Sequence, residues 1–260
     1  MRRRGLAGRA AAAAAAVLAA VLIAFGVYVS DYYHAEGSVR EYLAQEKERT
    51  SGSAEAVSET EISNSVPVRV EQTGYGWFLD GPSDRNAMIF YPGAKVDETA
   101  YIPLLYQFAK EGMDVCLVKM PFHLAVFGID KADEIIPQYG YTNWYIGGHS
   151  LGGAMGAAYA AGHADRLKGV VLLAAYATKK LDDSLKEIVV YGSQDGVIRT
   201  GKLTEGRQFA PKQYIEHVIE GGNHAMFGNY GEQKGDGSGL ITDKEQQAET
   251  VRAVMEAVRE

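Results

Sequence analysis

The amino-acid sequence predicts an α/β fold in which helices cover both faces of a mostly parallel sheet. Short apolar runs rich in β-branched and aromatic residues alternate along the chain with segments of helical periodicity. Several of these runs, such as 87–91 and 170–173, are apolar throughout, as expected of strands that are buried on both faces. With 260 residues, of which 47% are hydrophobic, the chain suits one domain with a sizeable core.

The predicted elements follow one another in a regular order. Strands are expected at residues 68–72, 77–79, 87–91, 114–119, 144–146, 170–173, 188–191 and 214–219. Helices are expected at 101–108, 131–138 and 154–161, the first because its apolar residues recur at i, i+3, i+4 and i+7. Thr242 and Glu245 form a capping box that predicts the start of the last helix.

The N-terminal 30 residues predict an export segment. Four arginines among the first nine residues precede an uncharged apolar stretch at 10–29, which is long enough to cross a bilayer as a helix. Basic residues on this side place the N-terminus in the cytoplasm and the rest of the chain outside. A cleaved signal peptide is the alternative, with Ala24-Phe25-Gly26 as its best cleavage site. Three tyrosines at 28–33 resemble an interfacial belt and favour an uncleaved anchor.

Composition separates a polar linker from the folded part. Residues 31–65 are rich in Ser, Glu and Thr, which is typical of a tether, so the globular domain is expected at 66–260. The formal net charge of −7 argues against a nucleic-acid partner. Cys116 is the single cysteine and lies in an apolar run, so we expect a buried structural thiol.

The stretch Gly148-His149-Ser150-Leu151-Gly152 is a candidate nucleophile site. A G-x-S-x-G pattern is weak by itself, because a chain rich in glycine and serine can match it by chance. Here it falls between a predicted strand and a predicted helix, where the two glycines permit a turn that projects the serine from the sheet. We expect Ser150 to be catalytic; the alternative is a phosphate-binding or purely structural glycine turn.

A serine nucleophile needs a base and an orienting carboxylate, and Asp195 is the candidate carboxylate. It follows the expected strand at 188–191, at the carboxyl end where such sheets place functional groups. Asp182 and Asp183 are the rivals, but they lie in the segment KKLDDSLKE, which is typical of solvated surface. We therefore assign the orienting role to Asp195.

His224 is the candidate base. It lies in EGGNHAMFG, just after an expected strand, on a loop that can bring it over the nucleophile. His217 falls inside that strand, His163 falls at a helix end, and His34 falls in the tether, so we expect these three to be bystanders.

The reaction also requires two N–H donors for the oxyanion. Leu151, directly after the nucleophile, is expected to supply one. The loop YPGAKVDETAY after the strand at 87–91 is expected to supply the other from Ala94, with Lys95 as the alternative. Pro92-Gly93 in this loop also fits an ordinary turn.

The site is expected to be open. Only about a dozen residues separate Leu173 from Ile188, too few for a helical cap at usual connection lengths. Loops must therefore form the walls of the site. The candidate substrate-contacting residues are His149, Phe122, His123 and Met226, with Leu124, Phe127 and Phe227 as further apolar candidates; some of them can equally complete the core, and His123 can be an ordinary loop histidine.

Four segments in order, YPGAKVDETAYIPL, GGHSLGG, YGSQDGV and GGNHAMFG, resemble the α/β-hydrolase superfamily, and within it the small lidless branch related to dienelactone hydrolases. The resemblance covers the whole predicted globular domain. It implies Ser150 as nucleophile, Asp195 and His224 as its partners, and Leu151 and Ala94 as oxyanion donors. Dienelactone hydrolases usually carry cysteine where Ser150 stands, and their oxyanion loop commonly begins with His-Gly instead of Tyr-Pro-Gly.

These features predict a serine hydrolase that cleaves a small-molecule carboxylic ester or thioester through an acyl-enzyme, anchored outside the cytoplasm or secreted. A peptidase or acyltransferase with the same triad, a non-catalytic binding module on the same scaffold, and a structural envelope protein are the alternatives. No motif indicates a metal or an organic cofactor, and the natural substrate and oligomeric state stay open.

Overall fold

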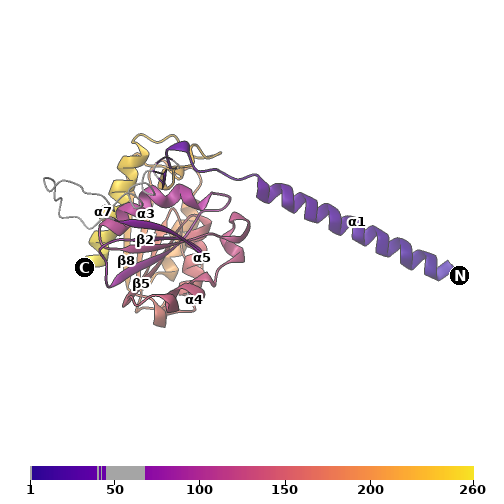
Figure 1. Cartoon of the computed structure of the whole chain (residues 1–260), viewed down its shortest axis with the longest axis horizontal. Helices are drawn as coiled ribbons and strands as arrows, with labels where there is room; N and C mark the ends of the chain where they lie inside the picture. Colours follow the sequence, from indigo (N-terminus) through magenta and orange to yellow (C-terminus); the bar gives the residue numbers. More distant parts are fainter. Residues whose placement is uncertain (1, 40, 42, 45–67) are drawn as a thin grey trace, which may run out of the picture. The chain divides into compact units, whose positions relative to one another are not determined.

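The structure, a computed structural model, describes residues 2–39, 41, 43–44 and 68–260. The chain divides into two compact units, Met1–Tyr32 and Tyr33–Glu260. The first unit consists mainly of α1 (Arg2–Ser30), and the second contains the sheet and the other helices (Figure 1).

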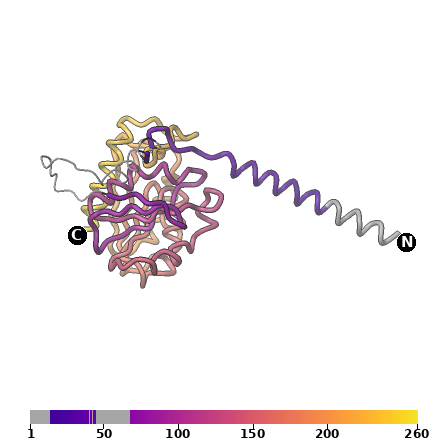
Figure 2. The backbone as a smooth tube through the Cα atoms, viewed as in Figure 1, coloured from indigo at the N-terminus to yellow at the C-terminus, as the bar shows by residue number. Residues whose placement is uncertain are grey.

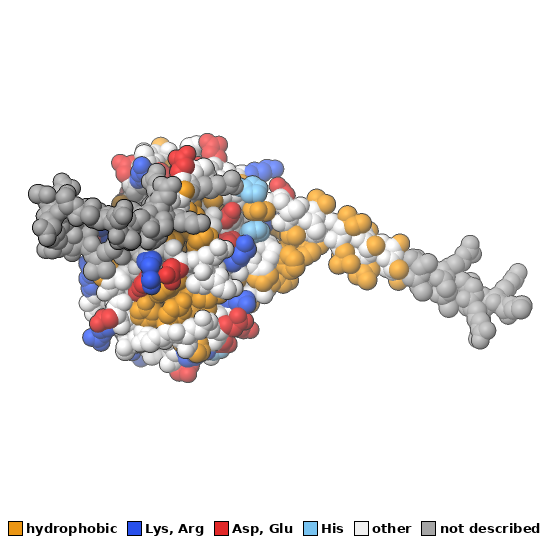
Figure 3. All heavy atoms as spheres, in the orientation of Figure 1, with side chains coloured by type: hydrophobic (Ala, Val, Ile, Leu, Met, Phe, Trp, Pro, Cys, Tyr) orange, Lys and Arg blue, Asp and Glu red, His pale blue; other side chains and the backbone are white. Residues whose placement is uncertain are grey.

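α1 is a continuous helix that includes the predicted apolar stretch at 10–29. Apolar side chains are exposed along its described part (Figure 3). Nevertheless, no helix in the described part of the chain combines the length and the apolar character needed to cross a membrane. Much of the stretch is alanine, whose small side chain contributes little transfer free energy. The predicted membrane anchor is therefore not supported, and export of the folded unit stays a prediction.

Within the described residues, eight strands form one sheet in the order β1-β2-β4-β3-β5-β6-β7-β8. Each predicted strand is present, and together with the helices this confirms the predicted α/β architecture. The strands are β1 (Arg69–Thr73), β2 (Gly76–Asp80), β3 (Asn86–Tyr91), β4 (Asp114–Val118), β5 (Asn143–His149), β6 (Gly169–Leu173), β7 (Lys186–Gly192) and β8 (Gln213–Ile219).

The sheet is parallel except at one side. β1 and β2 form an antiparallel hairpin, and β2 also pairs antiparallel with β4. All neighbours from β4 through β3 to β8 are parallel. Parallel strands direct their carboxyl ends to one edge, so the loops that follow β3, β5, β6, β7 and β8 gather there.

Helices cover both faces of the sheet (Figure 1). α3 (Ile102–Lys110) and α7 (Asp243–Arg259) contact each other on one face, and α5 (Leu151–Ala160) packs on the other with α4 (Lys131–Ile135) and α6 (Thr200–Gly206). The capping box predicted at Thr242 is present at the start of α7. Short 3₁₀ turns complete the connections at Glu98–Tyr101, Pro121–His123, Ala125–Phe127, Ile136–Gln138, Ala164–Arg166, Arg207–Phe209 and Ala225–Phe227.

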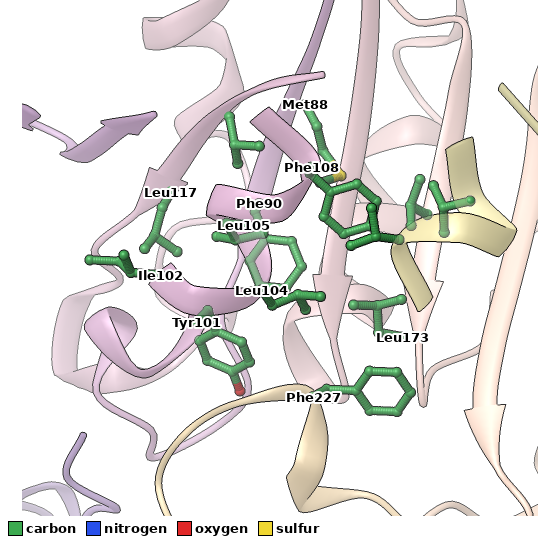
Figure 4. Close-up of a cluster of buried hydrophobic side chains, with 14 of the residues drawn as sticks. Met88, Phe90, Tyr101, Ile102, Leu104, Leu105, Phe108, Leu117, Leu173 and Phe227 are labelled. Atoms are coloured by element: carbon green, nitrogen blue, oxygen red, sulfur yellow. The ribbon is translucent and has the colours of Figure 1, made fainter. Parts of the chain in front are cut away.

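Each face of the sheet carries its own hydrophobic cluster. Phe90, Phe108 and Leu173 are fully buried in the cluster under α3 and α7 (Figure 4). The cluster on the opposite face includes Cys116, and burial raises the pKa of this thiol to about 12, as fits a structural cysteine. The sheet lies between these two clusters. Figure 2 traces the course of the backbone through the folded unit.

The connection between β6 and β7, residues 174–185, contains neither helix nor strand. No cap domain is therefore built at this point of the described chain. This agrees with the expectation that the site has no helical cap.

The segment predicted as a tether, residues 31–65, begins with residues that pack on the folded unit. Ala35 and Val39 are buried in the cluster under α3, and Tyr33 forms a parallel bridge with Val96. The sequence did not predict this, because isolated apolar residues among charged ones carry no periodic signal. The compact unit therefore starts at Tyr33, and the later part of the predicted tether lies outside the described residues.

We expect the buried Glu187 on β7 to make the free energy of unfolding depend on pH. Its carboxyl is buried, and Oε2 has no hydrogen-bond partner among the described residues. Burial raises its pKa from 4.5 to about 7, so the folded state favours the protonated form. The contribution of Glu187 to the free energy of unfolding is therefore most favourable below about pH 4.5. It decreases by up to about 3 kcal/mol as the pH rises to about 7.

Urea unfolding from about pH 5 to pH 8 checks this prediction. Glu187→Gln is expected to remove this part of the pH dependence, because the amide does not titrate. Glu216→Gln is the control, because hydrogen bonding from Arg207 holds the pKa of Glu216 low, at about 2, below the range studied. An unchanged pH dependence in Glu187→Gln would contradict the assignment.

Candidate active site

Ser150 stands at a strained turn between β5 and α5. Its backbone has φ 54° and ψ −121°, a conformation that residues other than glycine rarely adopt. A Cβ on Gly148 would lie 2.6 Å from the Tyr91 carbonyl oxygen, and one on Gly152 would lie 2.1 Å from it. Both positions therefore require glycine, and the turn has the geometry of a nucleophile elbow.

Asp195 and His224 meet at the carboxyl edge of the sheet, in the loops after β7 and β8. His224 Nδ1 lies 2.8 Å from Asp195 Oδ2, and both side chains are almost fully buried. The other carboxylate oxygen of Asp195 accepts hydrogen bonds from the N–H groups of Val197 and Ile198, each at 2.8 Å. The carboxylate is thus fixed by its own loop and holds the imidazole from one side.

Ser150 and His224 border one cavity of about 430 Å³. Because Nδ1 of His224 is engaged by Asp195, Nε2 is the nitrogen left to receive a proton. Nε2 is buried and has no hydrogen-bond partner among the described residues, so no bond to Ser150 is formed in this structure. Serine–histidine bonds of this kind often form only when substrate is bound.

Sequence reasoning missed Asp236, which joins the two loops that carry Asp195 and His224. Its Oδ1 accepts from Gly196 N–H at 3.0 Å, and its Oδ2 accepts from Ala225 N–H at 2.8 Å. Gly196 follows Asp195 and Ala225 follows His224, so one carboxylate ties both neighbours together. In the sequence Asp236 is a turn residue in KGDGSG, and no pattern links it to Asp195 or His224.

The two candidate oxyanion donors, Leu151 and Ala94, have backbone N–H groups without a partner among the described residues. Leu151 is the first residue of α5, so its N–H has no partner within the helix. In the loop after β3, Gly93 N–H donates to Tyr101 Oη at 3.1 Å and Lys95 N–H donates to the His123 carbonyl at 2.8 Å. The N–H of Ala94 lies between these two N–H groups and makes no hydrogen bond among the described residues. This favours Ala94 over Lys95 as the second candidate oxyanion donor.

His149 does not line the cavity at Ser150 as expected. Its side chain is 1% exposed, and burial, followed by the nearby His224, lowers its pKa well below 6.5. Tyr101 Oη accepts from Gly93, so its proton is free to donate to His149 Nδ1 at 2.8 Å. The ring of His149 therefore packs behind the oxyanion loop as a neutral hydrogen-bonded group.

The other three candidate contact residues also do not line the cavity at Ser150. Phe122 is half exposed and packs edge-to-face on Phe127. His123 presents its carbonyl to the oxyanion loop, and Met226 borders two different cavities with Asn223. These residues lie in loops after β4 and β8, but position in a loop does not determine which way a side chain points.

The walls of the cavity come instead from the loops directly after β6 and β7. These wall residues are small or apolar except for one arginine: Leu151, Ala154, Ala174, Ala175, Tyr176, Val197, Ile198 and Arg199. The rule that ligands bind beyond the carboxyl ends of parallel strands could have identified them. The expected open, mostly apolar site is present, with different residues in its walls.

The rival residues have other partners. His217 Nε2 lies 2.8 Å from a Glu249 carboxylate oxygen, and His163 Nδ1 lies 2.9 Å from the Tyr159 carbonyl. Asp182 accepts hydrogen bonds from Ser184 on the surface. Among the described residues, no group of three His, Cys, Asp or Glu side chains is arranged to hold a metal ion.

Solved structures with the same fold include several hydrolases. A monoacylglycerol lipase from Paleococcus ferrophilus is 13% identical, covers 74% of this chain and 100% of its own, and has a TM-score of 0.53. Carboxyl esterase 2 from Tuber melanosporum is 12% identical, with coverages of 84% and 98% and a TM-score of 0.51. A dienelactone hydrolase from Anabaena variabilis is 9% identical, with coverages of 74% and 99% and a TM-score of 0.51.

The family itself is shown by sequence. No curated protein matches the chain significantly. The sequence profile described as the alpha/beta hydrolase family, however, matches residues 87–248, which is more than half of the chain and includes the elbow and both of its candidate partners. The chain therefore belongs to the α/β hydrolase family.

Proposed function

We propose that this protein is a serine hydrolase that cleaves a carboxylic ester or thioester through an acyl-enzyme. The observation that carries the proposal is the placement of Ser150, on a strained elbow, at the same cavity as the buried His224–Asp195 pair. Strain of this kind is retained where function requires it. The lipase and esterase among the structural neighbours support the same reaction class.

The proposed reaction has two stages. Ser150 Oγ attacks the substrate carbonyl carbon while His224 Nε2 takes its proton, and Asp195 stabilises the resulting imidazolium. The N–H groups of Leu151 and Ala94 stabilise the oxyanion, and the leaving alcohol or thiol departs with the proton from His224. Water then attacks the acyl-enzyme, His224 again takes a proton, and the carboxylic acid is released as the Ser150 hydroxyl re-forms.

The cavity favours small substrates with an apolar acyl or leaving group. A volume of about 430 Å³ bordered by Ala154, Ala174 and Ile198 suits short chains, and no cap closes over it in the described chain. We expect 4-nitrophenyl acetate and butyrate to be hydrolysed faster than long-chain esters. The test is their hydrolysis by the full-length protein, with product analysis in added methanol to separate hydrolysis from acyl transfer. Absence of turnover on every ester and thioester would contradict the proposal.

Arg199 adds a cationic group to this mostly apolar wall, so we expect a short acyl group that ends in a negative charge to gain an ion pair with it. Arg199 follows Val197 and Ile198, whose N–H groups bind the Asp195 carboxylate, and its side chain borders the cavity at Ser150. Among the described residues it has no salt-bridge partner, so its charge is available to substrate. We expect Arg199→Ala to lower kcat/KM for monoethyl succinate about fivefold to tenfold.

The comparison substrate is ethyl 4-methylpentanoate, which has nearly the same shape as monoethyl succinate but no charge. Its kcat/KM is expected to change less than twofold in Arg199→Ala. Lys202→Ala is the matched control, because Lys202 is an exposed cation on α6 that pairs with Glu205 instead of bordering the cavity. Equal losses on the charged and neutral esters would exclude charge recognition by Arg199.

A further inference from the structure

Residues 33–36, which we call the strap, form backbone hydrogen bonds with the loop that carries Ala94. Tyr33 N–H donates to the Lys95 carbonyl at 2.7 Å, and Asp97 N–H donates to the Tyr33 carbonyl at 2.8 Å. These two bonds form the parallel bridge between Tyr33 and Val96. The strap thus adds one bridge to the outer side of the loop, immediately after the candidate oxyanion donor.

The strap also contacts the chain that follows His224. Glu36 N–H donates to the Asn229 carbonyl at 2.9 Å, and Lys234 N–H donates to Tyr33 Oη at 3.1 Å. The rings of Tyr33 and Tyr230 pack with their centroids 5.6 Å apart. One short segment therefore joins the loop of the oxyanion donor to the loop of the base.

A row of aromatic rings extends this contact inward. Tyr230 packs on Tyr101 at a centroid distance of 6.3 Å, and Tyr101 Oη accepts the hydrogen bond from Gly93 N–H. Figure 4 shows Tyr101 with its hydroxyl directed away from the hydrophobic cluster. Gly93 on one side of Ala94 is thus held through Tyr101, and Lys95 on the other side is held by the strap.

The strap is itself anchored by burial. Ala35 is 7% exposed, and Val39, in the helical turn at residues 37–39 that follows the strap, is 1% exposed in the cluster under α3. Burying a valine side chain contributes roughly 1.5–3 kcal/mol. Ser38, next to Val39, is exposed, so the same turn offers a buried position and a matched exposed one.

We propose that the strap is a positioning element of the active site, which holds the peptide of Ala94 where an oxyanion donor is needed. The proposal rests on the proposed function. An oxyanion donor acts on charge that develops only in the transition state, so displacing it lowers kcat and leaves KM nearly unchanged. Catalysis in the folded unit then depends on a segment that precedes the sheet by more than thirty residues.

Val39→Asp in the full-length protein tests this proposal, because a carboxylate at a buried position expels the turn that anchors the strap. We expect kcat for 4-nitrophenyl butyrate to fall about 10-fold to 100-fold while KM changes less than about twofold. Amide exchange of Asp97, whose N–H donates to Tyr33, should accelerate in parallel. Ser38→Asp adds the same charge at the exposed neighbour and should change neither quantity.

The proposal is overturned if Asp97 exchanges freely in Val39→Asp while kcat stays at the parent value. A loss of kcat shared equally by Ser38→Asp also overturns it. If Val39→Asp does not fold, Tyr33→Ala removes the ring and hydroxyl contacts at a half-buried position, and kcat should fall about threefold to tenfold. Absence of ester hydrolysis by the unaltered protein contradicts the proposed function instead, because the exchange of Asp97 is measured without substrate.

Discussion

Replacing Ser150 with alanine is expected to reduce kcat for ester hydrolysis by about 10⁶-fold, the size of effect that loss of the nucleophile has in other serine hydrolases. Alanine keeps a Cβ at the same strained φ of 54°, so the elbow and the thermal stability should be preserved. The residual rate reflects only the oxyanion donors and substrate binding.

The measurement is the initial rate on 4-nitrophenyl butyrate, beside a thermal unfolding curve of the same sample. Ser184→Ala is the control, because Ser184 is exposed and interacts only with Asp182 in the described structure. It should keep the parent rate. Turnover by Ser150→Ala within tenfold of the parent would exclude Ser150 as the nucleophile.

Replacing Asp195 with asparagine is expected to lower kcat by about 10⁴-fold with little change in KM. The amide can still occupy the site, but it cannot stabilise the imidazolium, and its NH₂ group presents a donor to Nδ1 of His224. Nε2 would then carry the proton in the neutral ring and could not accept one from Ser150. The effect is large because both side chains are buried, so no water replaces the lost charge.

Two other carboxylates, Asp182 and Asp236, serve as comparisons for Asp195. Asp182→Asn removes an exposed carboxylate of the rival segment and should leave kcat within about twofold of the parent. Asp236→Asn weakens the link between the loops of Asp195 and His224, so we expect an intermediate loss of kcat. A larger loss in Asp182→Asn than in Asp195→Asn would contradict the assignment.

The sequence predicted the sheet well because its central strands, such as β3, β4 and β6, are buried on both faces. Such strands appear as continuous apolar runs, and β3, β4, β6 and β7 were located by them. The half-buried β8 was located by its β-branched and aromatic residues instead. The elbow was equally visible, because close backbone approach at Gly148 and Gly152 leaves room only for glycine. The order of Ser150, Asp195 and His224 along the chain then identified the two loops that the structure brings together.

What the sequence did not reveal depends on contacts between distant segments. Ala174 and Arg199 line the cavity because β6 and β7 follow the elbow strand β5 in the order of the sheet. No local sequence pattern predicts this strand order. His149 occupies the variable position of the elbow, but its hydrogen bond to Tyr101 directs it into the interior. The strap was not predicted because it also depends on a contact between distant segments, the bridge of Tyr33 with Val96 across sixty-odd residues of chain.

The most direct test of the central claim is labelling of the full-length protein with a fluorophosphonate, which reacts with activated serines, followed by mass spectrometry of the adduct. Our account predicts one phosphonylated residue, Ser150, with labelling lost in Ser150→Ala and in His224→Ala. A folded protein that stays unlabelled, or an adduct on any other serine, would contradict the assignment of Ser150 as the nucleophile.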